Sequence, residues 1–532
     1  MKSFWKQGEP FVWVTGAALS VTLLMAMVLI VVVLVNGLGV FWPSRVATAT
    51  LHDGGSVLGE VVRSEAVFEG EGERLQFKVG NRELYGLDFR WIDKADISSI
   101  TYADDTMVLE RMEYGNFYGR LVGLSPEAQA VSGGGDAVRQ LRQAHAYVMQ
   151  QKDQLEELDD KLASVNYRMD QLQRKEKALL YEGRSPSDPE IRTLRQKRSG
   201  LTAKFQSLHQ RQMKQVTELR NYTATFADIS GTDRDMALMD LVRFYQPNSM
   251  SVLSKVRYYM VKLAELLTGS PRESNTEGGL FPAIFGTVML IFIMSLFSFP
   301  LGVLAAIYLR EYAKEGMVVR MVRIAVNNLA GIPSIVYGIF GLAFFVYGVG
   351  GSIDRLFFPE RLPTPTFGTG GILWASLTLS LLTVPVVIVA TEEALGAIPA
   401  GVREGSLALG ATKFQTLTRI LLPMASPGIM TGLILAMARA AGEVAPLMIT
   451  GVVKIAPALP VDGNFPFLHL DRKFMHLGFH IYDIGFQSPN VEAAKPMVFV
   501  TTLLLVLIVL IMSSVAIHLR NKMKKRYTYG TF

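Results

Sequence analysis

Residues Phe281–Leu309, which read FPAIFGTVMLIFIMSLFSFPLGVLAAIYL, decide the fold of this chain of 532 residues. The stretch contains no charged residue, and a helix of about 20 apolar residues can cross the hydrocarbon core of a bilayer. Five other stretches are long and apolar enough to do the same, so the sequence predicts six membrane-spanning helices. The other five are Val12–Val35, Ile324–Val349, Ile372–Ala390, Ile429–Val452 and Met497–His518.

The composition indicates a chain that is only partly embedded in lipid. Half of its residues are hydrophobic and its mean hydropathy is +0.27, too high for a purely soluble protein and too low for one that is all membrane. The chain has no Cys, which excludes a disulfide framework, a Cys-ligated zinc site and a thiol nucleophile. The first apolar run is too long for the core of a cleaved signal peptide, so we expect an uncleaved signal anchor.

The distribution of basic residues predicts the topology. Six crossings place both termini on one side, and with the N-terminus inside, the inner stretches 1–10, 310–323, 392–425 and 519–532 hold 14 Lys and Arg. The two short outer loops, 350–371 and 451–496, hold six. This bias fits the positive-inside rule, so we expect cytoplasmic termini and residues 36–280 on the outer side. The basic character of the chain then follows from topology, and nucleic-acid binding is not needed to explain it.

The predicted outer segment combines two patterns. Alternating runs between Val57 and Val122 indicate half-exposed strands, which return at Tyr222–Ile229 and Met236–Phe244. After Gly133-Gly134-Gly135, leucines and other apolar residues recur in heptads, and a second such seam follows the Pro-containing turn 183–189. We therefore expect a small β domain over 36–270 with an inserted antiparallel coiled-coil hairpin at about 137–217, each arm about 60 Å long. Pairing of the first seam between two copies of the chain is the alternative.

The predicted inner loop 392–425 carries the most specific motif. It reads Glu404-Gly405-Ser406-Leu407-Ala408-Leu409-Gly410, and Ile420-Leu421-Leu422-Pro423 follows after nine residues. A phosphate-binding P-loop is excluded, because Lys413 does not directly follow the second glycine and the segment follows a membrane helix instead of a strand. We expect that this chain does not hydrolyse ATP itself.

The loop resembles the coupling loop of ABC-transporter permeases. The residues that keep the spacing of that family are Glu404, Gly410, Ile420, Leu422 and Pro423, while Gly405-Ser406 replaces the usual Ala-Ala. The pattern predicts a short helix, a tight turn at the glycine and a second helix that ends at the proline. Such a unit could sit in a cleft of a partner and move as one body.

Further motifs resemble the PstA-type permease of the phosphate uptake system. The similarity covers about residues 275–518 and the first helix, in the order of that family, whereas residues 36–270 have no counterpart in its short members. The matching stretches are Asn275–Gly279, Pro300–Gly302, Ala306–Tyr312, Pro333–Gly338 and Gly428–Leu447.

The resemblance implies an α-helical polytopic membrane protein with the ABC importer permease fold. It would be a transporter subunit without catalytic residues, importing inorganic phosphate across the bacterial inner membrane by alternating access. Its implied partners are a second, PstC-type permease, a PstB-type ATPase dimer that binds ATP and Mg, and a periplasmic PstS-type phosphate-binding protein. It would need no cofactor of its own, and it divides into 1–35, the outer domain 36–270 and the transmembrane domain 271–532.

Arg439 and Glu443 are the candidate residues of the substrate path. They lie four residues apart in the predicted fifth crossing, and we expect them on one helix face. Charges are costly there and by default mark a transport path or an ion pair. An Arg fork suits an oxyanion, but a purely structural pair is the alternative. The family often has another Arg near the end of the fourth helix, which Val384–Val389 lacks, and this puts a two-arginine relay in doubt.

Other interpretations remain open at this stage. His476 and His480 have helical metal-ligand spacing near Asp483, although we expect no metal site there. Residues alone do not exclude another oxyanion, such as molybdate or sulfate. A membrane scaffold or phosphate-signalling subunit that acts through its outer coiled coil is the other alternative, but a scaffold has no reason to keep Glu404, Gly410 and Pro423.

Overall fold

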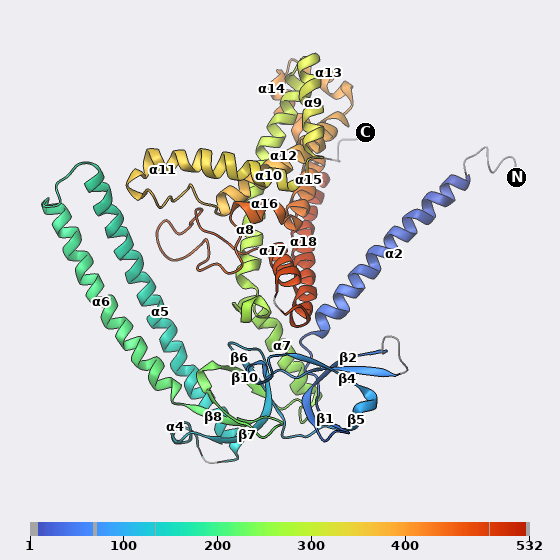
Figure 1. Ribbon diagram of the computed structural model, residues 1–532. Coiled ribbons are helices and arrows are strands. Elements are labelled where there is room, and N and C mark those ends of the chain that lie inside the picture. The colour runs from blue at the N-terminus through green and yellow to red at the C-terminus, as the bar shows by residue number, and fades with distance from the viewer. Residues whose placement is uncertain (1–8, 67–71, 134, 489, 528–532) are drawn as a thin grey trace. The chain divides into compact units, whose positions relative to one another are not determined.

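The computed structural model describes residues 9–66, 72–133, 135–488 and 490–527. The described chain divides into two compact units (Figure 1). The membrane unit contains residues up to Val40, Leu280–Ser352 and Phe367 onward, and the inserted unit contains Phe41–Gly279 and Ile353–Thr366. Gly134 of the predicted glycine run, and residues 1–8 of the predicted N-terminal stretch, lie outside the described residues.

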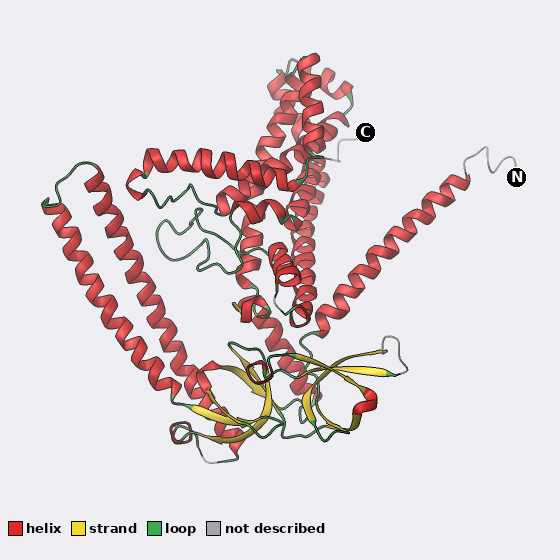
Figure 2. Ribbon diagram, in the orientation of Figure 1, coloured by secondary structure: helices red, strands yellow, loops and turns green. Residues whose placement is uncertain are grey.

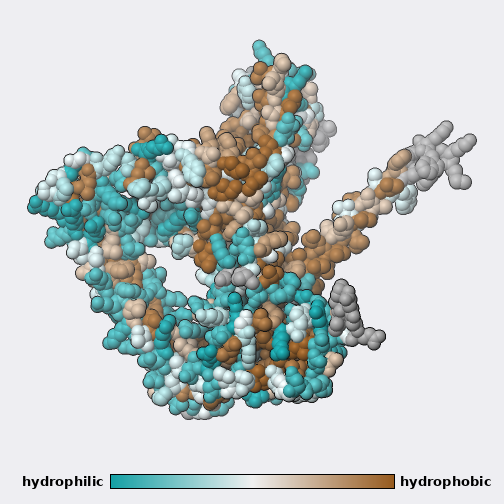
Figure 3. Space-filling model, in the orientation of Figure 1, coloured by the Kyte–Doolittle hydropathy of each residue, from teal (hydrophilic) through white to brown (hydrophobic). Residues whose placement is uncertain are grey.

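The membrane unit contains six helical segments that are long and apolar enough to cross a membrane, and hydrophobic side chains cover much of their surface in Figure 3. This confirms the predicted number among the described residues. The segments are Phe11–Gly39, Phe281–Tyr312, Ser334–Phe357, Ile372–Gly396, Lys413–Gly442 and Val491–Lys525.

The helices of the membrane unit are interrupted in two places: the inserted unit separates the first of them from the others, and a long loop over residues 451–476 separates two of the later ones. Their bounds are α2 (Glu9–Gly39), α8 (Phe281–Ile307), η4 (Tyr308–Tyr312), α9 (Met317–Leu329), α10 (Ser334–Phe340), η5 (Gly341–Gly350), α11 (Gly351–Phe357), α12 (Ile372–Gly396), α13 (Ala400–Ala408), α14 (Lys413–Thr416), η7 (Leu417–Leu421), α15 (Leu422–Gly442), α16 (Ala445–Thr450), α17 (Leu477–Tyr482), η8 (Asp483–Gln487) and α18 (Val491–Tyr527).

The core of the membrane unit lies between α8, α12 and α15. Leu290 and Met294 of α8 are buried against Leu379 and Leu382 of α12, together with Ala440 of α15. Small residues permit this close packing: a Cβ atom on Gly302 of α8 would lie 2.7 Å from the Val387 side chain of α12. Glycine is used in membrane helices in this way because it lets neighbouring backbones approach.

Two predicted spans have the wrong bounds. The third begins at Ser334 and not at Ile324, because α9 is a separate helix that ends at Leu329. Pro333 disfavours the helical conformation of the residue before it, so the chain turns between the two helices. The predicted fifth span Ile429–Val452 is also wrong: the helical segment runs from Lys413 to Gly442, and α16 is separate.

The inserted unit contains two five-stranded antiparallel sheets, which confirms the strand pattern of the sequence. The strand orders are β4-β3-β2-β1-β5 and β10-β6-β7-β8-β9. The strands are β1 (Val46–Leu51), β2 (Ser56–Ala66), β3 (Glu73–Lys78), β4 (Phe89–Asp93), β5 (Ile97–Thr101), β6 (Met107–Arg111), β7 (Phe117–Leu124), β8 (Thr223–Ala227), β9 (Asp233–Ala237) and β10 (Leu241–Tyr245).

Shorter elements complete the inserted unit. Helix α7 follows the second sheet, and a small two-stranded ladder leads out of the unit. Their bounds are α3 (Arg82–Tyr85), η1 (Lys94–Asp96), α4 (Pro126–Ala130), η2 (Leu238–Asp240), α7 (Val252–Thr268), β11 (Pro271–Arg272), η3 (Glu273–Asn275), β12 (Glu277–Gly278) and η6 (Pro359–Arg361).

Two long helices form the predicted hairpin, α5 (Ala137–Tyr181) and α6 (Pro189–Arg220), which lie side by side in Figure 2. Asp136 and Asp188 cap their N-termini. The turn between the two helices contains Gly183 at a φ of 85°, a conformation that glycine adopts readily. The arms are unequal: their 45 and 32 residues correspond to about 68 and 48 Å, so the prediction of equal arms was wrong.

The first half of α5 belongs to the core of the second sheet. Leu141, Ala144 and Val148 are fully buried with Phe117 and Phe226 of the strands. Further along, Glu176 of α5 binds Arg195 at 2.6 Å and Arg198 at 2.9 Å across the hairpin. The hairpin therefore has a root that is part of the β domain and a distal part held by the pairing of its two arms.

Candidate functional site

The loop predicted to couple to a partner folds around one glycine. Gly410 has a φ of +87°, its N–H donates to the Leu407 carbonyl at 3.0 Å, and the Ala411 N–H donates to the Ser406 carbonyl at 3.2 Å. These two bonds close the end of α13 in the Schellman pattern, which requires a left-handed residue. Nothing lies within 4 Å of the position that a Cβ atom on Gly410 would take. The backbone torsion alone therefore explains why glycine stands here.

The helix after the turn is fixed by its own cap. Thr412 accepts from the Gln415 N–H at 3.2 Å, and the Gln415 side chain accepts from the Thr412 N–H at 2.9 Å, which forms a capping box. Ser406 and Thr416 are buried and share a hydrogen bond of 2.8 Å between their hydroxyls. The two short helices α13 and α14 are thereby held together across the turn.

The proline of the motif, Pro423, does not act as the sequence predicts. Ile420 lies in the π-helical turn η7, and Leu422 and Pro423 begin α15, so Pro423 does not stop a helix. The wider π-helical turn interrupts the regular ladder just before Pro423, where the missing N–H and the ring would otherwise disturb it. The helical segment consequently continues from Lys413 to Gly442, and the turn is joined directly to a membrane helix.

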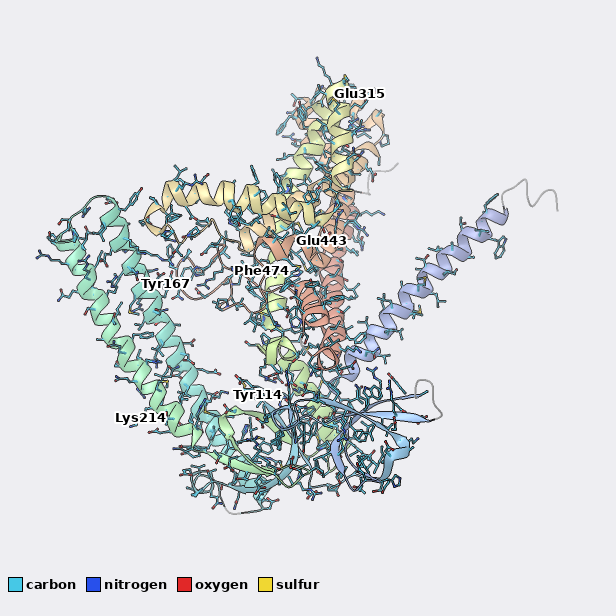
Figure 4. The ribbon with its side chains drawn as sticks, in the orientation of Figure 1. Tyr114, Tyr167, Lys214, Glu315, Glu443 and Phe474 are labelled. Atoms are coloured by element: carbon cyan, nitrogen blue, oxygen red, sulfur yellow. The ribbon has the colours of Figure 1, made fainter. Side chains whose placement is uncertain are left out.

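The surface of this loop is apolar around an exposed acid. Glu404 is exposed on α13, and three large apolar side chains near it are also exposed: Leu407 by 43%, Leu409 by 90% and Phe414 by 66%. Apolar side chains that are exposed together at one place are typical of a surface that binds a partner. The loop, α9 and Glu315 lie at one end of the membrane unit (Figures 1 and 4).

One ion pair of the loop was not predicted. Arg403 donates to Glu311 at 2.9 Å, and it also donates to the carbonyls of Leu395 at 2.7 Å and Ile398 at 3.2 Å. Glu311 belongs to η4, which continues α8, so this arginine joins α13 to the ends of α8 and α12. Glu311 lies in one of the matching stretches and Arg403 directly precedes the loop motif, but the two are 92 positions apart and nothing in the sequence pattern pairs them.

The Arg439–Glu443 pair is present, but not on one helix face as predicted. The Nε atom of Arg439 lies 3.6 Å from Oε1 of Glu443, and the side chains are 33% and 19% exposed. Helix α15 ends at Gly442, and Glu443 takes an extended conformation with ψ of 134°. Glu443 lies among the membrane helices, well away from the end marked by Glu315 (Figure 4).

The break after Gly442 gives the pair an unusual setting. The chain leaves α15 at Glu443 and re-enters a helix at Ala445 with Pro446 in its first turn. Gly338 of α10 packs against this second piece, where a Cβ atom would lie 2.8 Å from Cα of Pro446. Irregular backbone inside a membrane is tolerated where it is buried in protein or lines an aqueous cavity. A charged pair at such a break is a candidate ligand-binding place.

The histidines considered for a metal have other partners. His476 is the N-cap of α17 and not part of the helix, its Nδ1 accepts from the Gly478 N–H at 3.1 Å, and burial lowers its pKa to about 3. His480 lies 3.2 Å from the Thr501 hydroxyl, and Asp483 pairs with Lys454 at 3.2 Å. The helical spacing inferred from the sequence is therefore wrong, and the described ranges contain no group of three His, Cys, Asp or Glu fit to hold a metal.

Comparisons with known proteins identify the same region. Residues 298–525 match the family model described as "Binding-protein-dependent transport system inner membrane component". The phosphate transport system permease protein PstA of Mycobacterium leprae is 34% identical over 225 residues, which cover 42% of this chain and 68% of that protein. The probable PstA of Methanocaldococcus jannaschii is 33% identical over 221 residues, covering 41% and 67%.

Other similarities are less complete. The probable ABC transporter permease protein YqgH of Bacillus subtilis is 34% identical over 198 residues, which cover 37% of this chain and 60% of that protein. Among solved structures, the inward-facing MetNI methionine ABC transporter is 20% identical with a TM-score of 0.34, covering 46% of this chain and 95% of the other. A similarity of that size carries no argument of its own, whereas the loop and the charged pair both fall within the family match.

Proposed function

Because the chain belongs to the family of binding-protein-dependent transport system inner membrane components, and within it to the PstA-type permeases, we propose that it imports inorganic phosphate as one of two permease subunits. The observation that carries this proposal is the similarity to proteins named phosphate transport permeases. The family match over residues 298–525 includes both the loop 392–425 and the Arg439–Glu443 pair. Structural similarities to importers of other substrates are too low to favour any of them.

ATP hydrolysis takes place on a separate ATPase dimer that receives the loop. The exposed Leu409 and Phe414 enter a cleft of that partner, and Glu404 lies beside them for a polar contact. Movement of the loop reaches the membrane along two routes: through η7 directly into α15, and through the Arg403–Glu311 pair into α8. Because α8, α12 and α15 share one core, a displacement of the loop moves the helices together.

Phosphate passes close to Arg439. The guanidinium of arginine offers several N–H donors in a plane and binds oxyanions in pairs of parallel hydrogen bonds. In the resting chain Glu443 neutralises this charge from 3.6 Å, and a phosphate oxyanion would compete with the carboxylate for it. Since the subunit lacks an arginine at Val384–Val389, the second permease supplies any further cation on the path.

The proposed assembly has a defined orientation. A PstC-type permease, a PstB-type ATPase dimer and a PstS-type binding protein complete the importer in the bacterial inner membrane. Both termini and the loop 392–425 are cytoplasmic and the inserted unit is periplasmic, in line with the 14 Lys and Arg of the four predicted inner stretches. The chain itself carries no catalytic residue and needs no cofactor.

Radiolabelled phosphate uptake tests the function. Cells that lack this chain should lose high-affinity uptake and regain it when the chain is restored together with its partners. Parallel assays with labelled sulfate and molybdate separate phosphate from other oxyanions. Uptake of sulfate or molybdate, with no effect on phosphate, would overturn the assignment of the substrate, and normal uptake of all three without the chain would overturn the assignment as a permease.

A further inference from the structure

Helix α7 of the inserted unit exposes an apolar face. Its exposed side chains include six large apolar ones, with exposed fractions between 38% and 79%. Four of them, Leu253, Val256, Met260 and Leu267, follow one another at intervals of three, four and seven residues and therefore share one face of the helix. Arg257 is the charged residue among them. The six are Val252, Leu253, Val256, Met260, Val261 and Leu267.

The charged side of the same helix faces inward. Lys262 pairs with the buried Glu110 at 2.7 Å, and the Tyr258 hydroxyl donates to the same carboxylate. Glu265 pairs with Arg243 at 2.7 Å and Arg272 at 2.5 Å. A helix on the surface of a soluble domain has the opposite arrangement, with its apolar stripe toward the core.

This network fixes the orientation of the helix. Burial opposes the charge of Glu265, but Lys262, Arg243 and Arg272 outweigh it and hold the pKa of this carboxyl below its ordinary value. Glu265 is therefore ionised at neutral pH. Rotation of α7 to bury its apolar face would separate Glu110 from Lys262 and Glu265 from Arg243 and Arg272, and would leave the buried Glu110 with Arg243 alone at 3.6 Å. Breaking buried ion pairs in this way is unfavourable.

The chain connections hold both ends of α7 beside membrane spans. Near its start, Lys255 donates to the Pro43 carbonyl at 3.3 Å, and at its middle the Tyr259 ring lies 6.2 Å from the ring of Trp42. Trp42 follows the end of the first span at Gly39 by three residues. After its end, Gly279 packs against Gly269 and donates to the Ser270 carbonyl at 3.0 Å, two residues before the second span begins at Phe281. Two or three residues span at most about 11 Å. Short chain connections therefore tie helix α7, about 25 Å long, to the ends of two spans.

We propose that α7 lies in the outer interface of the lipid bilayer, with its exposed apolar face among the lipid chains. Because the ion pairs hold the charged side of α7 inward, its apolar face points outward and needs an apolar environment. The short connections to the two spans bring a bilayer within reach of this face. Trp42 and Tyr259 suit the same depth, because Trp and Tyr gather at the headgroup level. Arg257 reaches the lipid phosphates from the edge of this face. The helix then fixes the inserted unit on the membrane surface, as interfacial amphipathic helices do.

The absence of Cys from the sequence permits a direct test. Met260→Cys places a single thiol on the apolar face, and Ser207→Cys places one on the exposed surface of α6 as a matched control. Each full-length variant is labelled with an environment-sensitive fluorophore and reconstituted into phosphatidylethanolamine–phosphatidylglycerol vesicles, alone and with its partner subunits. Quenching is then measured with spin-labelled lipids and with aqueous iodide.

The proposal expects lipid quenching several-fold stronger at position 260 than at 207, with the reverse order for iodide, in the chain alone and in the complex. Equal iodide quenching at both positions would show that the face is in water and would overturn the proposal. Protection of position 260 from both quenchers would show that protein covers it, a partner subunit if this occurs only in the complex and a second copy if it occurs in the chain alone. Either result would also overturn it, without bearing on phosphate transport.

Discussion

Gly410 shows how one backbone torsion can hold the proposed coupling loop in shape. Its φ of +87° closes the Schellman turn between α13 and α14, and the space around its Cα is open. A side chain at this position would therefore meet no neighbour, and its cost comes from the torsion alone. For most L-residues this conformation costs roughly 1–2 kcal/mol, while Asn tolerates it better.

Substitutions at Gly410 should reduce phosphate uptake in a graded order. Asn should come closest to the natural protein, Ala should be weaker, and Gly410→Pro should abolish transport, because proline cannot take a positive φ and removes the N–H that bonds to Leu407. Uptake is measured at equal membrane abundance of each variant. Near-normal uptake by Gly410→Pro would overturn the assignment of this loop to coupling.

Arg439 can be tested for a role beyond charge. Arg439→Lys keeps the positive charge and loses the planar fork, and Arg439→Ala loses both. If Arg439 contacts phosphate, both variants should lose uptake by an order of magnitude or so, corresponding to about 1.4 kcal/mol or more, while the complex still assembles. The charge-neutral pair Arg439→Ala/Glu443→Ala serves as the control. Recovery of transport in the double variant would identify the two residues as a structural pair only.

The Arg403–Glu311 pair gives a prediction with an internal comparison. Arg403→Ala removes the ion pair and also two hydrogen bonds to the carbonyls of Leu395 and Ile398, whereas Glu311→Ala removes the ion pair alone. Hydrogen bonds to charged groups contribute about 1.5–3 kcal/mol each. We expect a larger loss of coupled ATP hydrolysis in the reconstituted complex for Arg403→Ala. A larger loss for Glu311→Ala would contradict the geometry described here.

At the scale of elements, the sequence predicted what depends on side-chain pattern and failed where the backbone decides. Hydropathy located six spans, alternation located the strands and heptads located α5 and α6. The breaks after Leu329 and Gly442 were missed, because the apolar runs continue through them and the interruption comes from Gly and Pro. The spacing of the loop motif predicted the short helix that carries Glu404 and the turn at Gly410. The partner of Arg403 could not be predicted, because it depends on the tertiary fold.

The hairpin can be shortened in two ways with different expected results. Removal of Ala137–Thr217 takes away Leu141, Ala144 and Val148, which are buried in the core of the second sheet, and should unfold the inserted unit. Each large-to-small core change already costs about 2–5 kcal/mol. Removal of Val165–Gln206 with a short Gly/Ser bridge keeps this root, including Leu155 and Leu158, and should leave the unit folded. Thermal unfolding of the purified full-length variants measures the difference.

The shorter deletion also tests whether the hairpin is accessory to transport. If its distal part only raises the local concentration of the binding protein, uptake should fall most when that protein is scarce and recover when it is saturating. The natural chain and the Glu176→Gln variant, which weakens the contacts to Arg195 and Arg198 without shortening the arms, are the controls. Complete loss of uptake at saturating binding protein, with the complex assembled, would show that the hairpin belongs to the transport machinery.

At the scale of the whole molecule, the arrangement rests on which side of the membrane each part occupies. The loop around Gly410 and the C-terminal basic cluster lie on the proposed cytoplasmic side. The cluster consists of Arg520, Lys522, Lys524, Lys525 and Arg526. The inserted unit and the hairpin lie on the other side in this proposal, because a single span, α2, separates them from the N-terminus. Because the chain has no Cys, a thiol introduced in any part of it is the only one that can be labelled.

Labelling in spheroplasts with a membrane-impermeant maleimide should therefore distinguish the two sides. Ser207→Cys, exposed on α6, should react in intact spheroplasts, whereas Lys413→Cys, exposed at the start of α14, should react only after the membrane is permeabilised. The positive-inside rule predicts this order because moving the basic inner stretches across the membrane is unfavourable. The Cys-free parent chain controls for background. Reaction of Lys413→Cys in sealed spheroplasts, with Ser207→Cys protected, would reverse the topology and with it the assignment of the loop to a cytoplasmic ATPase.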